Sequence, residues 1–198
     1  EEQKQIEALI NQDDEYDKIY RLGLWATPSN LIYSNWEIVK QWPSKIEETI
    51  YGVDFGFNHP TAVIAIDIAD GLYYIRQQLC ESHVTNTQLI DRLKNIIGDN
   101  KYAPVVADAA EPQRISEIQS AGINVYPCAK GKDSVKRGID LIRRNRLYVD
   151  YNSPDLIKEL QGYKWKTNAS GDILDEPLKF KDDCIDAMRY GITWLFDK

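Results

Sequence analysis

The spacing of apolar and polar positions predicts a sheet that begins with three closely spaced strands. Residues 49–55 alternate and are rich in β-branched and aromatic side chains, residues 61–68 (TAVIAIDI) form an apolar run, and residues 72–78 form a third strand-like stretch. Turn-forming residues separate these runs, GFNHP at 56–60 and Gly71. Strands joined by such short turns favour an antiparallel meander.

Farther along the chain, short apolar runs alternate with segments of helical period. Helical spacing predicts helices over 87–97, 111–121, 134–145, 154–162 and 183–196, and apolar runs predict strands at 104–107, 124–127 and 147–149. Residues 163–180 resemble a β-hairpin that turns at Asn168–Asp172. This order predicts an α/β fold: a mixed sheet with an antiparallel meander followed by alternating strands and helices, flanked by helices and carrying an added β-hairpin.

The first 45 residues follow a different pattern. Residues 1–20 are highly charged, with apolar residues at helical spacing, and predict a helix on a surface or linker. The next stretch is rich in Trp and Tyr and predicts a short strand at 31–33 within irregular structure. We therefore expect residues 1–45 to form an N-terminal helix and linker segment, and residues 46–198 to form the folded domain.

Composition indicates a protein that resides in a reducing compartment. The chain has 198 residues, of which 43% are hydrophobic and 28% charged, as in ordinary globular proteins. No apolar stretch is long enough to span a bilayer, and the first residues lack the order of a signal peptide. Cys80, Cys128 and Cys184 are odd in number and far apart, so they predict neither a disulfide framework nor a paired metal-ligand spacing. We expect a cytoplasmic location without a membrane.

The net charge of −7 limits how the chain can interact with nucleic acid. Neutralising phosphates requires Lys and Arg, so an acidic domain is expected to bind DNA weakly by itself. A metal site is still compatible with this charge, because bound cations restore positive charge locally.

Two acidic residues follow apolar strands. Asp54 ends the first predicted strand and runs into a glycine-containing turn, and Asp108 directly follows the apolar run at 104–107. Taken alone, Asp54 is typical of a turn-forming Asp, and Asp108 is typical of a helix N-cap.

Two further acids begin the last predicted helix. Asp183 and Asp186 are three residues apart and therefore project from one helix face, where their repulsion is relieved by a cation between them. A solvated acidic helix start is the alternative, with Asp182 as the N-cap and Arg189 neutralising Asp186.

Together these acids have the composition of a phosphodiester-cleaving metal site. Mg²⁺ prefers hard oxygen ligands, and two ions about 3.5–4 Å apart activate water and stabilise the leaving oxygen. We expect the carboxylates of Asp54, Asp108 and at least one of Asp183 or Asp186 to converge, and their repulsion to raise at least one pKa when metal is absent. The order of the elements, in which an initial meander carries the first acid and a late helix carries the last, is that of a ribonuclease-H-like sheet.

Four stretches resemble the nuclease domain of the large terminase subunit of tailed bacteriophages. They are YGVDFGFNHPTAVI at 51–64, the segment at 105–142 that begins VVADAAEP, the hairpin at 163–165 and DDCIDAMRY at 182–190. Residues 22–36 resemble the segment that links the ATPase and nuclease domains of such a motor.

The resemblance implies a metal-dependent endonuclease that cuts double-stranded concatemeric viral DNA during packaging, using two Mg²⁺ or Mn²⁺ ions. It makes Asp54 and Asp108 metal ligands. Relatives differ at the third position, so both Asp183 and Asp186 are retained. Implied partners are the portal protein, the small terminase subunit and the motor's own ATPase domain, and the implied location is the host cytoplasm, outside the virion. In Asn58-His59-Pro60 the chain departs from many relatives, which have an acid before the Pro, and His59 is an outer ligand, a proton shuttle or a polar turn residue.

Four lysines are candidate DNA contacts. Lys130 and Lys132 lie in a glycine-containing loop that opens a helix, without the spacing of a Walker A motif, so no ATPase step is expected of this chain. Lys164 and Lys166 flank Trp165 in the predicted hairpin, which forms either a DNA-guiding flap or an edge hairpin packed on the core.

Two other functions fit parts of the pattern. A sugar-kinase-like or actin-like phosphotransferase also begins with a strand-borne Asp followed by Gly, although that fold needs two such halves. A non-catalytic module that docks the packaging motor would use the same acids structurally.

Overall fold

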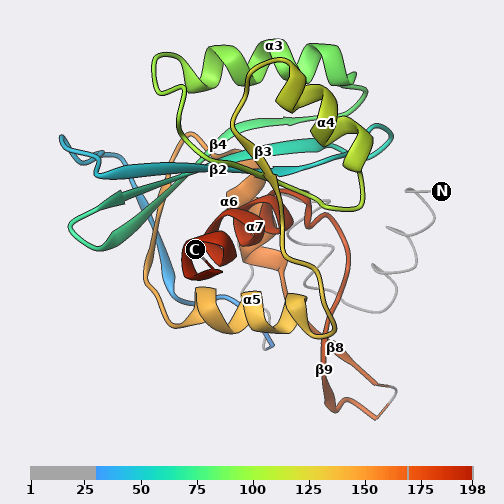
Figure 1. Ribbon diagram of the computed structural model, residues 1–198. Coiled ribbons are helices and arrows are strands. Elements are labelled where there is room, and N and C mark those ends of the chain that lie inside the picture. Colours follow the sequence, from blue (N-terminus) through green and yellow to red (C-terminus); the bar gives the residue numbers. More distant parts are fainter. Residues whose placement is uncertain (1–29, 169, 198) are drawn as a thin grey trace.

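A seven-stranded mixed sheet with helices on both faces forms the body of the computed structural model, which describes residues 30–168 and 170–197 (Figure 1). The strands of this sheet are β1 (Trp36–Val39), β2 (Glu48–Asp54), β3 (Thr61–Ala69), β4 (Leu72–Glu81), β5 (Val105–Ala107), β6 (Val125–Pro127) and β7 (Leu147–Asp150). The helices are α3 (Asn86–Ile97), α4 (Pro112–Ser120), α5 (Ser134–Arg143), α6 (Pro154–Gly162) and α7 (Asp183–Asp197). A separate hairpin consists of β8 (Trp165–Thr167) and β9 (Ile173–Pro177).

The order of the strands is β1-β7-β4-β3-β2-β5-β6. β2, β3 and β4 pair antiparallel, which confirms the predicted meander. β5 and β6 extend the sheet in parallel beyond β2, and β7 and β1 extend it in parallel beyond β4. Parallel neighbours end at the same edge, so the carboxyl ends of β2 and β5 lie side by side.

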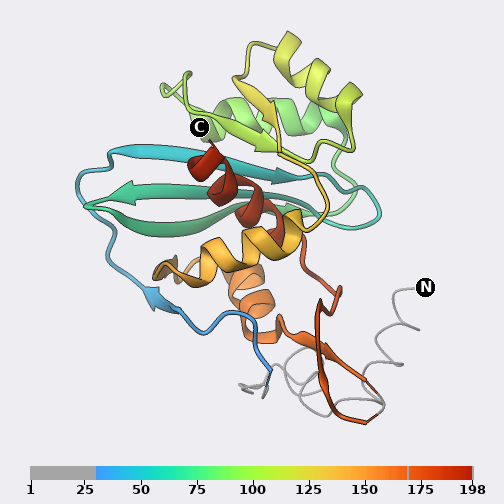
Figure 2. The same cartoon turned by 60° about the horizontal axis from the view of Figure 1, so that its bottom comes forward.

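The helices form two layers (Figures 1 and 2). α3 and α4 cover one face of the sheet, while α7 lies across the other face with α5 and α6 packed against it. Each face has its own apolar cluster. β3 contributes to both, because successive side chains of a strand point to opposite faces. The strand predicted for the apolar TAVIAIDI run is confirmed, and seven of the nine residues of β3, Thr61–Asp67, are fully buried.

A glycine lets α7 approach β2 closely. A Cβ atom on Gly52 would lie 1.8 Å from the backbone carbonyl oxygen of Ala187, so only glycine fits at this crossing. The close contact brings the first turn of α7 next to the end of β2.

Two predictions concern the N-terminal part of the chain. The strand predicted at 31–33 is wrong: Leu31 makes only an isolated bridge to Lys164, and the strand is β1, at Trp36–Val39. Its partner β7 is distant in sequence, so no local signal marks the pairing. The helix predicted over residues 1–20 lies outside the described residues.

The predicted hairpin is confirmed and extends away from the body of the domain (Figure 1). The Asn168 side-chain oxygen accepts hydrogen bonds from the Ser170 and Asp172 N–H groups, which fixes the turn. Trp165, at the base, is partly buried against the core. None of the helices in the described ranges has the length and apolar character needed to cross a bilayer.

Candidate active site

The four predicted acids line one pocket at an edge of the sheet. Asp54 is the last residue of β2, and Asp108 directly follows the neighbouring parallel strand β5. Asp183 and Asp186 come from the first turn of α7. Two adjacent strand ends and a helix that crosses them therefore bring together residues that are far apart in the chain.

Asp54 lies in an environment that strongly disfavours its charged form. Burial, followed by repulsion from Asp186, Asp183 and Asp108, raises the pKa of Asp54 from 3.8 to about 8. The expected rise in pKa is thus confirmed, although burial contributes more than repulsion. An uncompensated carboxyl group among other acids is an environment that a cation would stabilise.

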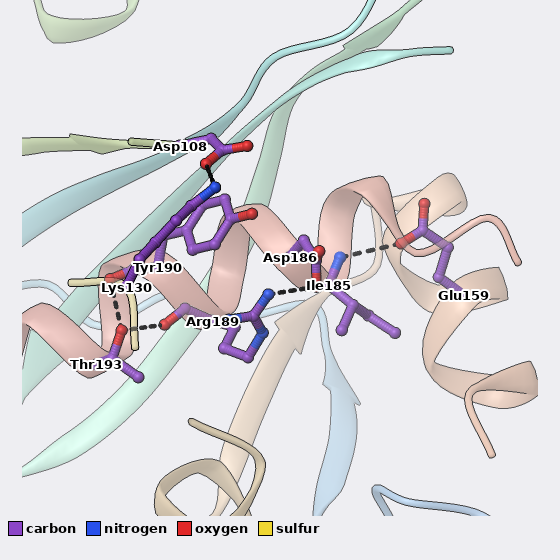
Figure 3. Close-up of polar contacts among 8 residues, drawn as sticks. All are labelled: Asp108, Lys130, Glu159, Ile185, Asp186, Arg189, Tyr190 and Thr193. Carbon is purple, nitrogen blue, oxygen red and sulfur yellow. Dashed lines mark hydrogen bonds and ion pairs between the residues drawn. The ribbon is translucent and has the colours of Figure 1, made fainter. Parts of the chain in front are cut away.

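Asp108 is held by a turn and by a lysine (Figure 3). Its Oδ1 atom accepts a hydrogen bond of 3.0 Å from the Ala110 N–H group, and it forms an ion pair with Lys130. The residue at the N-cap of α4 is Glu111, so Asp108 does not cap that helix. The Lys130 ammonium group lies where it partly neutralises the pocket.

Asp186 is paired with a buried arginine on its own helix (Figure 3). The Arg189 Nη2 atom donates to Asp186 Oδ1 at 2.8 Å, and the Arg189 side chain is 6% exposed. This ion pair is the neutralising contact considered from the sequence. The Asp186 N–H group donates to the Asp182 carbonyl oxygen, which agrees with Asp182 preceding the first turn.

The four carboxylates converge on one pocket, as expected, but no three of them come close enough to share a metal ion. Within the part of the chain that the structure describes, no three of these four acids have carboxylate oxygens that all lie within 4.8 Å of one another. Two of the four instead form ion pairs, with Lys130 and Arg189. The donors are carboxylate oxygens throughout, which suits hard divalent cations such as Mg²⁺ and Mn²⁺.

The remaining predicted residues differ in their placement. His59 is exposed and lines the same pocket, whereas Lys132 is exposed outside it. Lys164 was predicted to contact DNA, but it is only 4% exposed, because it lies in the chain segment that bridges to Leu31. Burial lowers the pKa of Lys164 to about 8. Lys166 forms an ion pair with Glu176 across the hairpin.

Three pocket residues were not singled out from the sequence. Lys179 is exposed and lines the pocket, Tyr190 borders it from α7, and Cys128 borders it from the segment after β6. Burial, reinforced by Asp54 and Asp186, raises the pKa of Tyr190. The run of lysines before DDCIDAMRY was the available signal for Lys179. Tyr190 and Cys128 carried no comparable signal.

Comparisons with known proteins agree on one family. The family model described as the terminase RNase H-like domain matches residues 54–193. The large terminase subunit of Escherichia phage T5 is 28% identical over 154 residues, covering 73% of this chain and 35% of the relative. The chain thus spans about a third of the length of that curated relative.

Solved structures show the same fold. The large terminase nuclease domain of bacteriophage SPP1, crystallised with bound Mn, superimposes with a TM-score of 0.69 at 22% identity, covering 82% of this chain and 97% of that one. The large terminase nuclease of thermophilic phage G20c, crystallised with bound magnesium, gives 0.61 at 22% identity, with 84% and 98% covered. The sheet predicted from the sequence is therefore ribonuclease-H-like.

Proposed function

This chain belongs to the family of terminase RNase H-like domains, and we propose that it is a metal-dependent endonuclease that cuts double-stranded, concatemeric viral DNA during genome packaging. One observation carries the proposal. Carboxylates from the ends of two adjacent strands and from the first turn of α7 line a single pocket. Phosphodiester hydrolysis by bound divalent cations needs such a set of oxygen ligands.

Asp54, Asp108 and an acid of α7 would hold two Mg²⁺ or Mn²⁺ ions. When bound, the ions would activate water and stabilise the negative charge that develops at the phosphate. One oxygen of Asp186 accepts from the Arg189 guanidinium group, and a cation bound to Asp186 would share this carboxylate with it. We retain both Asp183 and Asp186 as candidates for the third ligand.

The chain's own basic groups would position the substrate. Lys130 pairs with Asp108 in this structure, and a cation bound to Asp108 would compete with that ion pair. A released Lys130 side chain would lie at the pocket rim, where a DNA phosphate can accept a hydrogen bond from it. Exposed Lys179, on the same rim, would serve the same purpose. We propose no DNA contact for Lys164.

The surrounding assembly is proposed from the family alone. The ATPase domain of the motor, the small terminase subunit and the portal protein would be the partners, in the host cytoplasm and outside the virion. Of residues 1–45, β1 belongs to the sheet, and the stretch before it would link the nuclease to the ATPase domain. The phosphotransferase alternative has no specific observation in its favour.

A plasmid-cleavage assay tests the proposal. Intact protein with Mn²⁺ should convert supercoiled plasmid to open and linear forms, and EDTA should stop the reaction. Asp54→Ala and Asp108→Ala should each lower the rate by about 100-fold or more, because each removes a metal ligand. Asp91→Ala, an exposed acid on α3, is the matched control and should cut normally. If correctly folded protein leaves the plasmid intact at every metal concentration, the non-catalytic docking function replaces the nuclease.

A further inference from the structure

A second group of potential metal ligands lies behind the first turn of α7. Ligand atoms of Cys80, Glu159 and Cys184 all lie within 4.8 Å of one another. Cys80 comes from β4, Glu159 from α6 and Cys184 from the first turn of α7, so three elements each contribute one group. The wide sequence separation of the two cysteines explains why the sequence showed no metal-ligand spacing.

Glu159 is an unusual residue to find in this position. It is 5% exposed, and its Oε2 atom accepts a hydrogen bond of 3.0 Å from the Ile185 N–H group (Figure 3). Burial raises the pKa of Glu159 well above its usual range. A carboxyl group in a buried site is costly unless a positive charge or hydrogen bonds compensate it. The backbone N–H groups of Ile185 and Cys184 hold the Glu159 carboxyl group against the start of α7.

The chemistry of the three groups points to a particular class of cation. Two sulfur ligands and one carboxylate oxygen suit Zn²⁺, which commonly takes four ligands in tetrahedral geometry and bonds sulfur at about 2.3 Å. Ligands at such bond lengths are separated by less than about 4 Å, which a small adjustment of side chains here provides. Mg²⁺, in contrast, avoids thiolates.

The group is also accessible. Cys80 is only partly buried, and Cys80 and Glu159 line a pocket next to the candidate active site. The two pockets share Asn58, His59, Lys179 and Asp183. A cation can therefore enter from solvent, and a water molecule can complete its coordination.

We propose that Cys80, Glu159 and Cys184 form a binding site for one thiophilic divalent cation of the Zn²⁺ type, separate from the nuclease metal ions. The bound cation joins β4, α6 and the first turn of α7. Because Cys184 is adjacent to Asp183, the bound cation also restrains the helical turn that carries Asp183 and Asp186.

Cobalt provides the test, because thiolate ligands give Co²⁺ an intense near-ultraviolet charge-transfer band that carboxylate ligands do not. The protein is reduced with a non-thiol reductant and titrated with Co²⁺. We expect the band to saturate at one equivalent and to disappear when Zn²⁺ is added. The same result is expected for Asp54→Asn, which disables the proposed nuclease site, so the outcome is independent of the proposed nuclease function.

Three variants assign the ligands. Cys80→Ser and Cys184→Ser should each remove at least half of the band, and Glu159→Gln, which preserves the acceptor for Ile185, should weaken Co²⁺ binding by about tenfold or more. Cys128→Ser is the matched control, since Cys128 is the remaining cysteine and lines the nuclease pocket. It should keep the full band.

Two results would overturn the proposal. One is the absence of a charge-transfer band in folded wild-type protein. The other is a band that Cys128→Ser removes and Cys184→Ser retains, since this would place the thiolate in the nuclease pocket. Circular dichroism checks the fold of each variant, and Cys80→Ser, at a partly exposed position, carries the test if Cys184→Ser fails to fold.

Discussion

At the scale of single residues, the acids of the candidate site differ in their electrostatic surroundings. Asp108 and Asp186 each have a cation beside them, Lys130 and Arg189. Asp54, in contrast, is half-buried, and both this burial and its neighbouring acids raise its pKa. The unfavourable charge at Asp54 is the physical feature that a bound cation would relieve.

Asp54 should make the metal-free domain less stable as pH rises. Its pKa is raised from 3.8 to about 8 in the folded protein, so the folded state keeps a proton that the unfolded chain releases. The free energy of unfolding should therefore fall between about pH 4 and about pH 8. Asp54→Asn should flatten this dependence and melt at a higher temperature than wild type at pH 8 in EDTA.

The measurement is a series of thermal melts in EDTA across that pH range. Asp91→Asn, at an exposed position on α3, serves as control and should keep the wild-type dependence. Equal pH dependence in wild type and Asp54→Asn would show that Asp54 does not couple to folding.

Lys130 should compete with the metal ion. Its side chain is 48% exposed and pairs with Asp108, which is 19% exposed, so the interaction is worth at most about 1 kcal/mol. Lys130→Ala should therefore raise the affinity for Mn²⁺ by up to about fivefold in the absence of DNA. Calorimetric titration measures this, and Lys132→Ala, in the same loop but outside the pocket, should leave the affinity unchanged. A lower affinity in Lys130→Ala would mean that Lys130 supports the metal site.

At the scale of elements, the crossing of α7 over β2 determines where the acids meet. Gly52 permits this crossing, because any larger residue would collide with the carbonyl group of Ala187. A collision with backbone atoms is not relieved by a change of rotamer. The sequence motif YGVDFGF therefore carries two functions in one strand: a close contact at Gly52 and a candidate ligand at Asp54.

Gly52→Ala should destabilise the domain and weaken cleavage together. The added methyl group forces α7 away from β2, and overpacking of this kind costs about 1–3 kcal/mol or more. Denaturant unfolding measures the loss, and the plasmid assay measures the effect on the acids of α7. Gly131→Ala is the control, because a Cβ atom at Gly131 meets nothing within 4 Å. Wild-type stability in Gly52→Ala would refute the tight crossing.

At the scale of the whole molecule, the net charge of −7 works against holding DNA. Few cations surround the pocket, and some of them are engaged in ion pairs, as Lys130 is with Asp108 and Arg189 with Asp186. Affinity for DNA should thus depend on cations bound to the acids and on basic surfaces of the proposed partners.

DNA binding by the isolated chain should be weak in EDTA and stronger in Ca²⁺, which takes oxygen ligands. Fluorescence anisotropy with a labelled duplex measures both affinities. The gain from Ca²⁺ should disappear in the double variant Asp54→Asn/Asp108→Asn, whereas Asp91→Asn should keep it. An equal gain in the double variant would place the Ca²⁺ effect outside the candidate site.

The sequence alone was sufficient to predict the order and approximate bounds of most elements and to select the four candidate acids. Alternation in β2, the apolar run of β3 and helical spacing in α3 and α7 are local properties, because the period at which side chains face one side follows from backbone geometry. The position of Asp54 at the end of its strand and the shared helix face of Asp183 and Asp186 are local in the same way.

Tertiary structure alone decided which distant residues meet. β1 pairs with β7, Lys164 is buried, Lys130 reaches Asp108, and Cys80 and Cys184 lie beside Glu159. A periodic pattern shows which face of an element is apolar, but it does not specify the partner that covers that face. These partners follow from the packing of the complete chain, in which α7 crosses β2 at Gly52 and brings its first turn to the strand ends.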